Sequence, residues 1–266
     1  MKALPLHHKT IVITRDGKSN EQLAAHISKL GGVPISVPLL DFRLSTITEH
    51  EERIIHDLMQ YDWIVFTSAN GVSYFFELYY KLKKESVLRL PNIAVVGEKT
   101  KNSIEERGFI PSLVPKEYVA ECLIEMFMQE PIEQKKILLI KGNLARPVLA
   151  NGLKELGVTV HELVVYETYC PATREQLKQL LHQRVDAITF TSPSTIKHFV
   201  QLLRDENWQS WINKTLVCCI GPITQKTALE YGIIPQIVPN TYTLDHLLDE
   251  LTLFFINKEE ELDGTI

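Results

Sequence analysis

Short apolar runs alternate with stretches of helical spacing along most of the chain. Residues 11–14 form a mostly apolar run that is typical of a buried strand. Residues 21–30 then place apolar side chains at helical spacing, and this pattern stops at Gly31-Gly32. A second strand-like run follows at residues 33–37. Because strands and helices alternate, the pattern predicts parallel sheets that are covered by helices on both faces.

The chain contains a repeat with an offset of 124 residues. The segment at residues 62–68, Asp-Trp-Ile-Val-Phe-Thr-Ser, recurs at residues 186–192 as Asp-Ala-Ile-Thr-Phe-Thr-Ser. Glycines, prolines and a tyrosine keep the same offset. The pairs are Gly97/Gly221, Gly108/Gly232, Pro111/Pro235, Pro115/Pro239 and Tyr118/Tyr242. Chance alternation of apolar residues would not keep these residue types in register, so the chain contains two related long segments.

A weaker repeat, with an offset of 126 residues, relates residues 9–15 to residues 135–141. The chain is therefore a short, a long, a short and a long segment, with two predicted strands in each short one and three in each long one. One short and one long segment make a five-stranded, flavodoxin-like doubly wound domain. Periodicity leaves two pairings open. The halves are contiguous at 1–134 and 135–266, or they are swapped and the chain crosses between domains twice.

Composition and charge narrow the class of protein. Hydrophobic residues make up 45% of the chain and charged residues 23%, which is typical of a soluble globular protein. The net charge of −5 argues against a broad basic face for nucleic acid. No apolar run approaches the ~18 to 20 residues that a membrane helix needs, and we recognise no signal peptide. We therefore expect a cytoplasmic protein, without membrane or nucleic-acid partners, whose four cysteines are buried thiols.

Hydroxyls, glycines and cations follow the predicted strands. They stand at Thr14-Arg15, Thr67-Ser68, 97–100, 141–143, Thr191-Ser192 and 221–224. In such sheets ligands bind at the carboxyl ends of the strands, next to helix N-termini that favour anions. One interpretation is a shared anionic ligand. The alternative is that the serines and threonines only cap their helices.

The usual catalytic signatures are missing from the sequence. It contains neither a G-x-G-x-x-G nor a G-x-S-x-G motif, and its histidines lack the spacing of a metal site. Tyr166 is the candidate that remains, at the end of a predicted strand and near one of the crossings of the swapped arrangement. A phenol there could donate a proton to a leaving oxygen. The alternative is that its ring only packs at the domain edge.

Taken together, these motifs resemble the uroporphyrinogen-III synthase family. The matching pieces follow the family's order from about residue 9 to residue 250. They are Ile13-Thr14-Arg15, 66–72, 96–100, 141–143 with Arg146, 165–168, 190–194 and 220–224. The resemblance implies the swapped pairing, with two crossing strands that join two flavodoxin-like α/β domains. One domain would consist of residues 1–38 plus 169–266 and the other of residues 39–168, with a substrate cleft between them.

The resemblance also implies an activity. The family closes hydroxymethylbilane, a linear tetrapyrrole with eight carboxylates, into uroporphyrinogen III, with inversion of the last ring and loss of water. This is a lyase reaction of porphyrin and heme biosynthesis that uses no cofactor and no metal. The alternative function is a non-catalytic regulatory protein that binds an anion or a tetrapyrrole on the same scaffold. We expect a monomer. A transient contact with the preceding pathway enzyme is a further option that the sequence leaves undecided.

Site residues follow from the resemblance position by position. Tyr166 matches the family's catalytic tyrosine. The substrate-binding positions are the hydroxyls Ser68, Thr100, Ser192 and Thr224 and the cations Arg15, Lys141 and Arg146. The sequence departs from the family at Asp16, where proline is frequent, and at Lys141, where arginine is usual. Lysine keeps the charge of arginine but not its bidentate hydrogen-bonding geometry.

Overall fold

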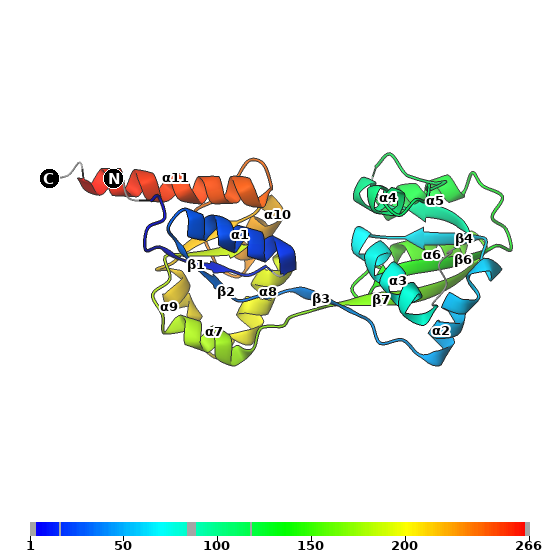
Figure 1. Cartoon of the computed structure of the whole chain (residues 1–266), viewed down its shortest axis with the longest axis horizontal. Coiled ribbons are helices and arrows are strands. Elements are labelled where there is room, and N and C mark those ends of the chain that lie inside the picture. The colour runs from blue at the N-terminus through cyan, green and yellow to red at the C-terminus, as the bar shows by residue number, and fades with distance from the viewer. Residues whose placement is uncertain (1–3, 16, 84–88, 118, 264–266) are drawn as a thin grey trace. The chain divides into compact units, whose positions relative to one another are not determined.

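The structure is a computed structural model that describes residues 4–15, 17–83, 89–117 and 119–263 (Figure 1). Strands and helices alternate and the sheets are mainly parallel, which confirms the predicted α/β class. The chain divides into two compact units. Unit 1 consists of Met1–Asp41 and Tyr169–Ile266, and unit 2 of Phe42–Thr168. The domains implied by the resemblance are divided after residues 38 and 168.

Unit 1 is built on a parallel sheet of four strands in the order β2-β1-β8-β9. The strands are β1 (Thr10–Ile13), β2 (Val33–Ser36), β8 (Ala187–Phe190) and β9 (Leu216–Cys219). A parallel bridge between Cys218 and Ile237 continues the sheet beyond β9 at the place of a fifth strand. This is the strand order of a flavodoxin-like fold.

Helices cover both faces of the unit 1 sheet. Ile11 and Ile13 pack against α1 (Gly17–Lys29) and α11 (Leu244–Asp263), which lie side by side (Figure 1). Val12, between them in β1, points to the opposite face, because successive side chains of a strand alternate. That face is covered by α7 (Arg174–Leu181), α8 (Pro193–Leu202), α9 (Trp208–Ile212) and α10 (Pro222–Glu230).

Unit 2 repeats this plan with one additional strand. Its sheet has the order β3-β7-β6-β4-β5. The strands are β3 (Asp41–Leu44), β4 (Trp63–Phe66), β5 (Asn92–Val95), β6 (Lys136–Gly142) and β7 (Thr159–Tyr169). One face carries α2 (Glu49–His56), the short 3-10 helix η1 (Leu58–Gln60), α3 (Ala69–Leu82) and α4 (Glu98–Glu105). The other face carries α5 (Ala120–Phe127) and α6 (Val148–Glu155).

The strands β3 and β7 run antiparallel to each other. Arg43 forms an ion pair with Glu167 at 2.7 Å, and the backbone N–H of Ser45 donates to the carbonyl of Val165 at 3.1 Å. Residue numbers rise along one strand as they fall along the other, which is the antiparallel register. The chain passes between the units at the ends of these two strands, after residue 41 and after residue 168.

The 124-residue repeat is visible in single hydrogen bonds. A carboxylate oxygen of Asp62, just before β4, accepts from the backbone N–H of Lys136 at 2.9 Å. Asp186 occupies the same place before β8 and accepts from the N–H of Thr10 at 2.8 Å. Each aspartate therefore fixes the register between the central strand of its sheet and that strand's neighbour. The equivalent hydrogen bonds of Asp62 and Asp186 are structural evidence that the two units are related.

The cysteines differ in burial. Cys218 and Cys219 lie on opposite faces of β9 and are fully buried, as predicted. Burial raises the pKa of both thiols, that of Cys219 to about 12, so both stay protonated. Cys122 and Cys170 are partly exposed, which makes the expectation of burial wrong for these two. None of the helices in the described part of the chain combines the length and hydropathy that crossing a membrane requires.

Candidate active site

A cavity of about 370 Å³ in unit 2 brings together three of the expected site residues. Ser68 follows β4, Arg146 lies in the segment after β6, and Tyr166 lies near the end of β7. These three strands are neighbours in the sheet, and the cavity lies at their carboxyl ends, where parallel sheets bind ligands. Its apolar walls include Val96 and Leu149.

The ring of Tyr166 lies directly against the backbone of Gly142. A Cβ atom at residue 142 would stand 2.4 Å from Cζ of Tyr166, so only glycine leaves room for the ring. The pairing of β6 with β7 is irregular between Lys141 and Gly142, where the register shifts by one residue. Asn143 N–H donates to the carbonyl of Tyr166 at 3.1 Å. The Lys-Gly-Asn motif therefore shapes the backbone on which the phenol rests.

Two further aromatic rings hold Tyr166 from other sides. Tyr74 of α3 stacks on it with ring centroids 5.5 Å apart and an interplanar angle of 23°. Phe42 of β3 contacts it edge-on at 5.8 Å. The hydroxyl of Tyr74 also donates to the carbonyl of Phe42 at 3.0 Å, which ties the two neighbours together. Aromatic pairs of this kind contribute about 0.5–1.5 kcal/mol beyond the burial of their area, so the orientation of the ring is well defined.

Ser68 caps α3 and also contacts the phenol of Tyr166. Its side chain caps α3 by accepting from the N–H of Gly71 at 3.0 Å. The same oxygen lies 3.2 Å from Oη of Tyr166. Where Ser68 donates its proton across this contact, the phenolic proton of Tyr166 is left for a ligand oxygen. The capping role and the site role are therefore compatible, although the sequence offered them as alternatives.

Arg146 adds a positive charge to the same cavity. Its side chain is exposed, and it forms no ion pair with any residue that the structure describes. The preceding segment is fixed by Asn143, whose side-chain oxygen accepts from the N–H of Thr168 at 2.8 Å. The side-chain amide of Asn143 donates back to the carbonyl of Thr168 at 3.3 Å. The cavity thus combines a cation, the hydroxyls of Ser68 and Tyr166 and a helix N-terminus, which suits a carboxylated ligand.

Comparison with known proteins shows to which family the chain belongs. The profile of the family described as uroporphyrinogen-III synthase HemD matches residues 21–249. The chain belongs to the uroporphyrinogen-III synthase family. It is 31% identical over 244 residues to a putative uroporphyrinogen-III synthase of Methanocaldococcus jannaschii, covering 90% of this chain and 96% of that protein. It is 29% identical over 255 residues to a uroporphyrinogen-III synthase of Synechococcus elongatus, covering 93% and 96%.

Solved structures show the same fold. A mutant uroporphyrinogen III synthase of Thermus thermophilus matches with a TM-score of 0.63 at 21% identity, over 94% of this chain and 99% of that chain. The synthase of Helicobacter pylori matches with a TM-score of 0.57 at 20% identity, over 92% and 99%. The predicted fold class of this family member is therefore confirmed.

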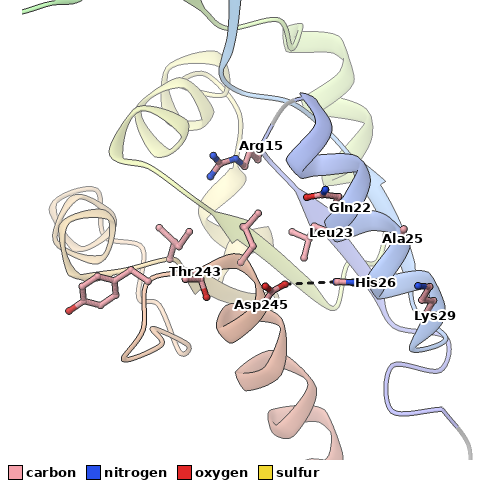
Figure 2. Close-up of a pocket in the computed structure, with 11 residues that line it drawn as sticks. Arg15, Gln22, Leu23, Ala25, His26, Lys29, Thr243 and Asp245 are labelled. Carbon is pink, nitrogen blue, oxygen red and sulfur yellow. Dashed lines mark ion pairs between the residues drawn. The ribbon is translucent and has the colours of Figure 1, made fainter. Parts of the chain in front are cut away.

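The remaining site positions of the family lie elsewhere in the chain. Thr100 and Thr224 are the third residues of α4 and α10, and only 4% and 3% of their surface is exposed. Ser192 caps α8 by accepting from the N–H of Thr195 at 3.3 Å, and Pro193 begins that helix. Arg15 lies in unit 1, where it lines a separate cavity between α1 and the segment before α11 (Figure 2).

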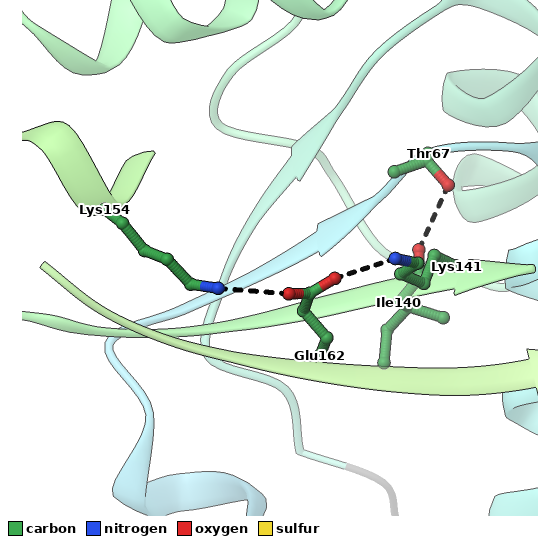
Figure 3. Close-up of polar contacts among 5 residues, drawn as sticks. All are labelled: Thr67, Ile140, Lys141, Lys154 and Glu162. Carbon is green, nitrogen blue, oxygen red and sulfur yellow. Dashed lines mark hydrogen bonds and ion pairs between the residues drawn. The ribbon is translucent and has the colours of Figure 1, made fainter. Parts of the chain in front are cut away.

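Lys141 forms an ion pair within unit 2 (Figure 3). Its ammonium lies 2.7 Å from one carboxylate oxygen of Glu162 on β7, and the ammonium of Lys154 lies 3.2 Å from the other. The hydrogen bond from Lys141, followed by the one from Lys154, holds the pKa of Glu162 below its usual range. Only 14% of the Lys141 side chain is exposed, and it is absent from the lining of the cavity that contains Tyr166.

Sequence reasoning missed Phe42 and Tyr74. Neither belongs to a repeated motif or follows a strand, and their contact with Tyr166 depends on how three elements pack.

The described residues show no set of metal ligands. Among the residues that the structure describes, no three histidines, cysteines or carboxylates are grouped closely enough to hold an ion.

Proposed function

We propose that this protein converts hydroxymethylbilane into uroporphyrinogen III, with loss of water and inversion of the last ring, as a cyclising lyase. The observation that carries the proposal is the position of Tyr166. Its phenol is held by three neighbours, contacts Ser68 at 3.2 Å and shares a cavity with Arg146. The family to which the chain belongs and the names of its relatives support the same reaction.

In the proposed reaction Tyr166 acts on the leaving hydroxyl. The phenol donates its proton to that oxygen, the carbon–oxygen bond breaks, and water departs with the electron pair of the bond. Ser68, as a donor to the phenolic oxygen, stabilises the negative charge that develops there. The substituted carbon of the last pyrrole ring attacks the resulting cation and forms a spiro intermediate. Rearrangement then closes the ring, and the last ring loses a proton, which returns Tyr166 to its protonated state.

The remaining groups bind and orient the substrate. Arg146 and the N-terminus of α3 attract peripheral carboxylates, which fixes the linear chain in a folded form. The substrate is reactive and closes spontaneously without inversion, so catalysis consists mainly in selecting the productive conformation. We therefore expect that no single side chain is indispensable, and that the reaction needs neither a cofactor nor a metal.

A product analysis tests the proposal. Purified protein is mixed with freshly made hydroxymethylbilane, the products are oxidised to porphyrins, and the two isomers are separated. We expect the inverted isomer to predominate at early times. Formation of the uninverted isomer alone, at the spontaneous rate, would overturn the proposal and leave the non-catalytic binding function on the same scaffold.

Five finer statements belong to the same proposal. The two domains of the proposed enzyme are residues 1–38 plus 169–266 and residues 39–168. The enzyme works in the cytoplasm, as a monomer, on a small-molecule substrate. Its contact with the preceding pathway enzyme is at most transient. Size-exclusion chromatography with light scattering measures the oligomeric state, and a stable dimer would contradict that part.

A further inference from the structure

Unit 1 contains a larger cavity, of about 640 Å³, which we name the α1–α11 groove (Figure 2). Arg15 stands at its upper end, just after β1, and Gln22, His26 and Lys29 follow one another along α1. The start of α11 forms the opposite wall. The groove begins at the carboxyl end of β1, the edge at which sheets of this kind bind ligands.

Its charge is mostly positive. Arg15 and Lys29 form no ion pair with the residues that the structure describes. His26 faces Asp245, with Nδ1 and Oδ1 3.9 Å apart, and Asp245 is the one carboxylate among the described residues that line the groove. Among these described residues, Arg15, Lys29 and the imidazole of His26 therefore stand against a single acid. An acidic ligand is the chemistry that this balance favours.

The comparison with unit 2 explains why Arg15 lacks an ion pair among the described residues. By the 126-residue offset, Arg15 corresponds to Lys141, which pairs with Glu162 at 2.7 Å. The same offset from Glu162 leads to Ser36. Unit 1 therefore keeps the cation of the repeat but lacks the carboxylate that neutralises it in unit 2.

The groove also has an aromatic and apolar side. The ring of Tyr242 lies over Gly221, where a Cβ atom would stand 3.1 Å from Cδ1 of the ring, yet 60% of Tyr242 remains exposed. Leu23 and Leu244 add apolar surface nearby. An exposed aromatic ring beside cations suits a ligand that combines flat aromatic rings with carboxylates.

We propose that the α1–α11 groove binds pyrrole rings of the tetrapyrrole through their carboxylates. The inference rests on the proposed function, which supplies a ligand with both features. In this assignment Arg15, His26 and Lys29 bind the acidic side chains, and Tyr242 stacks on a ring.

Steady-state kinetics with matched variants tests the inference. Lys29→Gln removes a cation, and His26→Gln removes an imidazole, each from an exposed position of the groove. Lys214→Gln removes an exposed lysine of the same unit, which lies before the amino end of β9 and does not line the groove, and serves as the control. We expect each groove variant to raise KM for hydroxymethylbilane by about 2- to 5-fold, the range for one exposed charge, with kcat within about twofold of wild type. The control leaves KM unchanged.

Two further measurements sharpen the result. The dependence of KM on salt becomes shallower in the groove variants than in wild type and control, because fewer charges take part in binding. Tyr242→Leu raises KM, whereas Tyr242→Phe keeps the ring and the wild-type value. If KM is the same in both groove variants, in Tyr242→Leu and in wild type, the inference is wrong.

A separate readout keeps this inference distinct from the proposed function. If the wild-type protein does not form the inverted isomer, the proposed function fails, and a fluorescence titration with uroporphyrin III decides about the groove. Weaker binding by Lys29→Gln than by Lys214→Gln then supports a carboxylate site without synthase activity. Equal affinities, or no binding by wild type, overturn the groove as well.

Discussion

The same kind of helix cap occurs in both units, at Ser68 and at Ser192, but its surroundings differ. Ser68 and Ser192 have nearly identical backbone angles, φ −160° with ψ 157° and 158°, and each accepts from the N–H three residues on. In unit 2 the cap also contacts the phenol of Tyr166. The residue 126 positions before Tyr166 is Leu40, which has no hydroxyl. The repeat has therefore preserved the scaffold in both units, while the phenol is present in one.

A second pair of equivalent residues shows the same divergence. Tyr74 and His198 are 124 residues apart, on α3 and α8. Tyr74 donates to the carbonyl of Phe42, and a ring nitrogen of His198 contacts the carbonyl of Leu39. Both helices thus hold a backbone carbonyl of the segment where the chain leaves unit 1. Only the unit 2 residue also stacks on the candidate catalytic ring.

The largest effect is expected from Gly142→Ala. The new Cβ would stand 2.4 Å from Cζ of Tyr166, so the ring must move, and displacement by about 1 Å can lower a rate by about 10²-fold. Initial rates of inverted-isomer formation compare the variant with wild type. A Gly142→Ala variant as active as wild type would remove the ring's position from the mechanism.

Tyr166→Phe should come next. It keeps the ring contacts and removes only the phenolic proton, so we expect a loss of about 10- to 100-fold, below the upper range for a general acid because the substrate is reactive. Residual activity above the spontaneous rate is part of the expectation. Stopped assays with both isomers quantified measure it. Wild-type activity would show that the phenol transfers no proton.

The two caps provide a smaller, more selective test. Ser68→Ala and Ser192→Ala each lose a capping bond and should lower the free energy of unfolding by about 1 kcal/mol, as measured in urea. Ser68→Ala also loses the contact with Tyr166, worth about 1 kcal/mol, and should slow the reaction by about 5-fold. An equal loss of activity in both variants would contradict the division of roles.

The smallest effect concerns the ion pair of unit 2. The folded-state pKa of Glu162 lies below its unfolded value near 4.5, so its stabilisation is present above that pH and is lost as pH falls through the folded pKa. Because the pair is partly exposed, Glu162→Gln should cost less than about 1 kcal/mol at pH 7. Its unfolding free energy should vary less with pH below about 5 than that of wild type. Identical pH profiles would show that the pair contributes nothing.

The sequence predicted the elements better than their partners. The predicted strands at residues 11–14 and 33–37 lie within one residue of β1 and β2, because apolar runs and their flanking turns are local signals. Ser68 and Tyr166, which the sequence places after one strand and at the end of another, both line the cavity of unit 2. The ion pair of Lys141 with Glu162 was not predicted, because it depends on the register between two neighbouring strands.

The discontinuous make-up of unit 1 has a consequence for the order of folding. Its central strand β1 pairs with β8, which brings Ile11 beside Ala187. The most distant contact across the sheet of unit 2, between Arg43 and Glu167, spans fewer residues, and unit 2 is one continuous stretch, Phe42–Thr168. Closing a longer loop costs more conformational entropy, and a chain folds on the ribosome from its first residues onward. Unit 2 can therefore form during synthesis, while the first strand and helix of unit 1 wait for the last third of the chain.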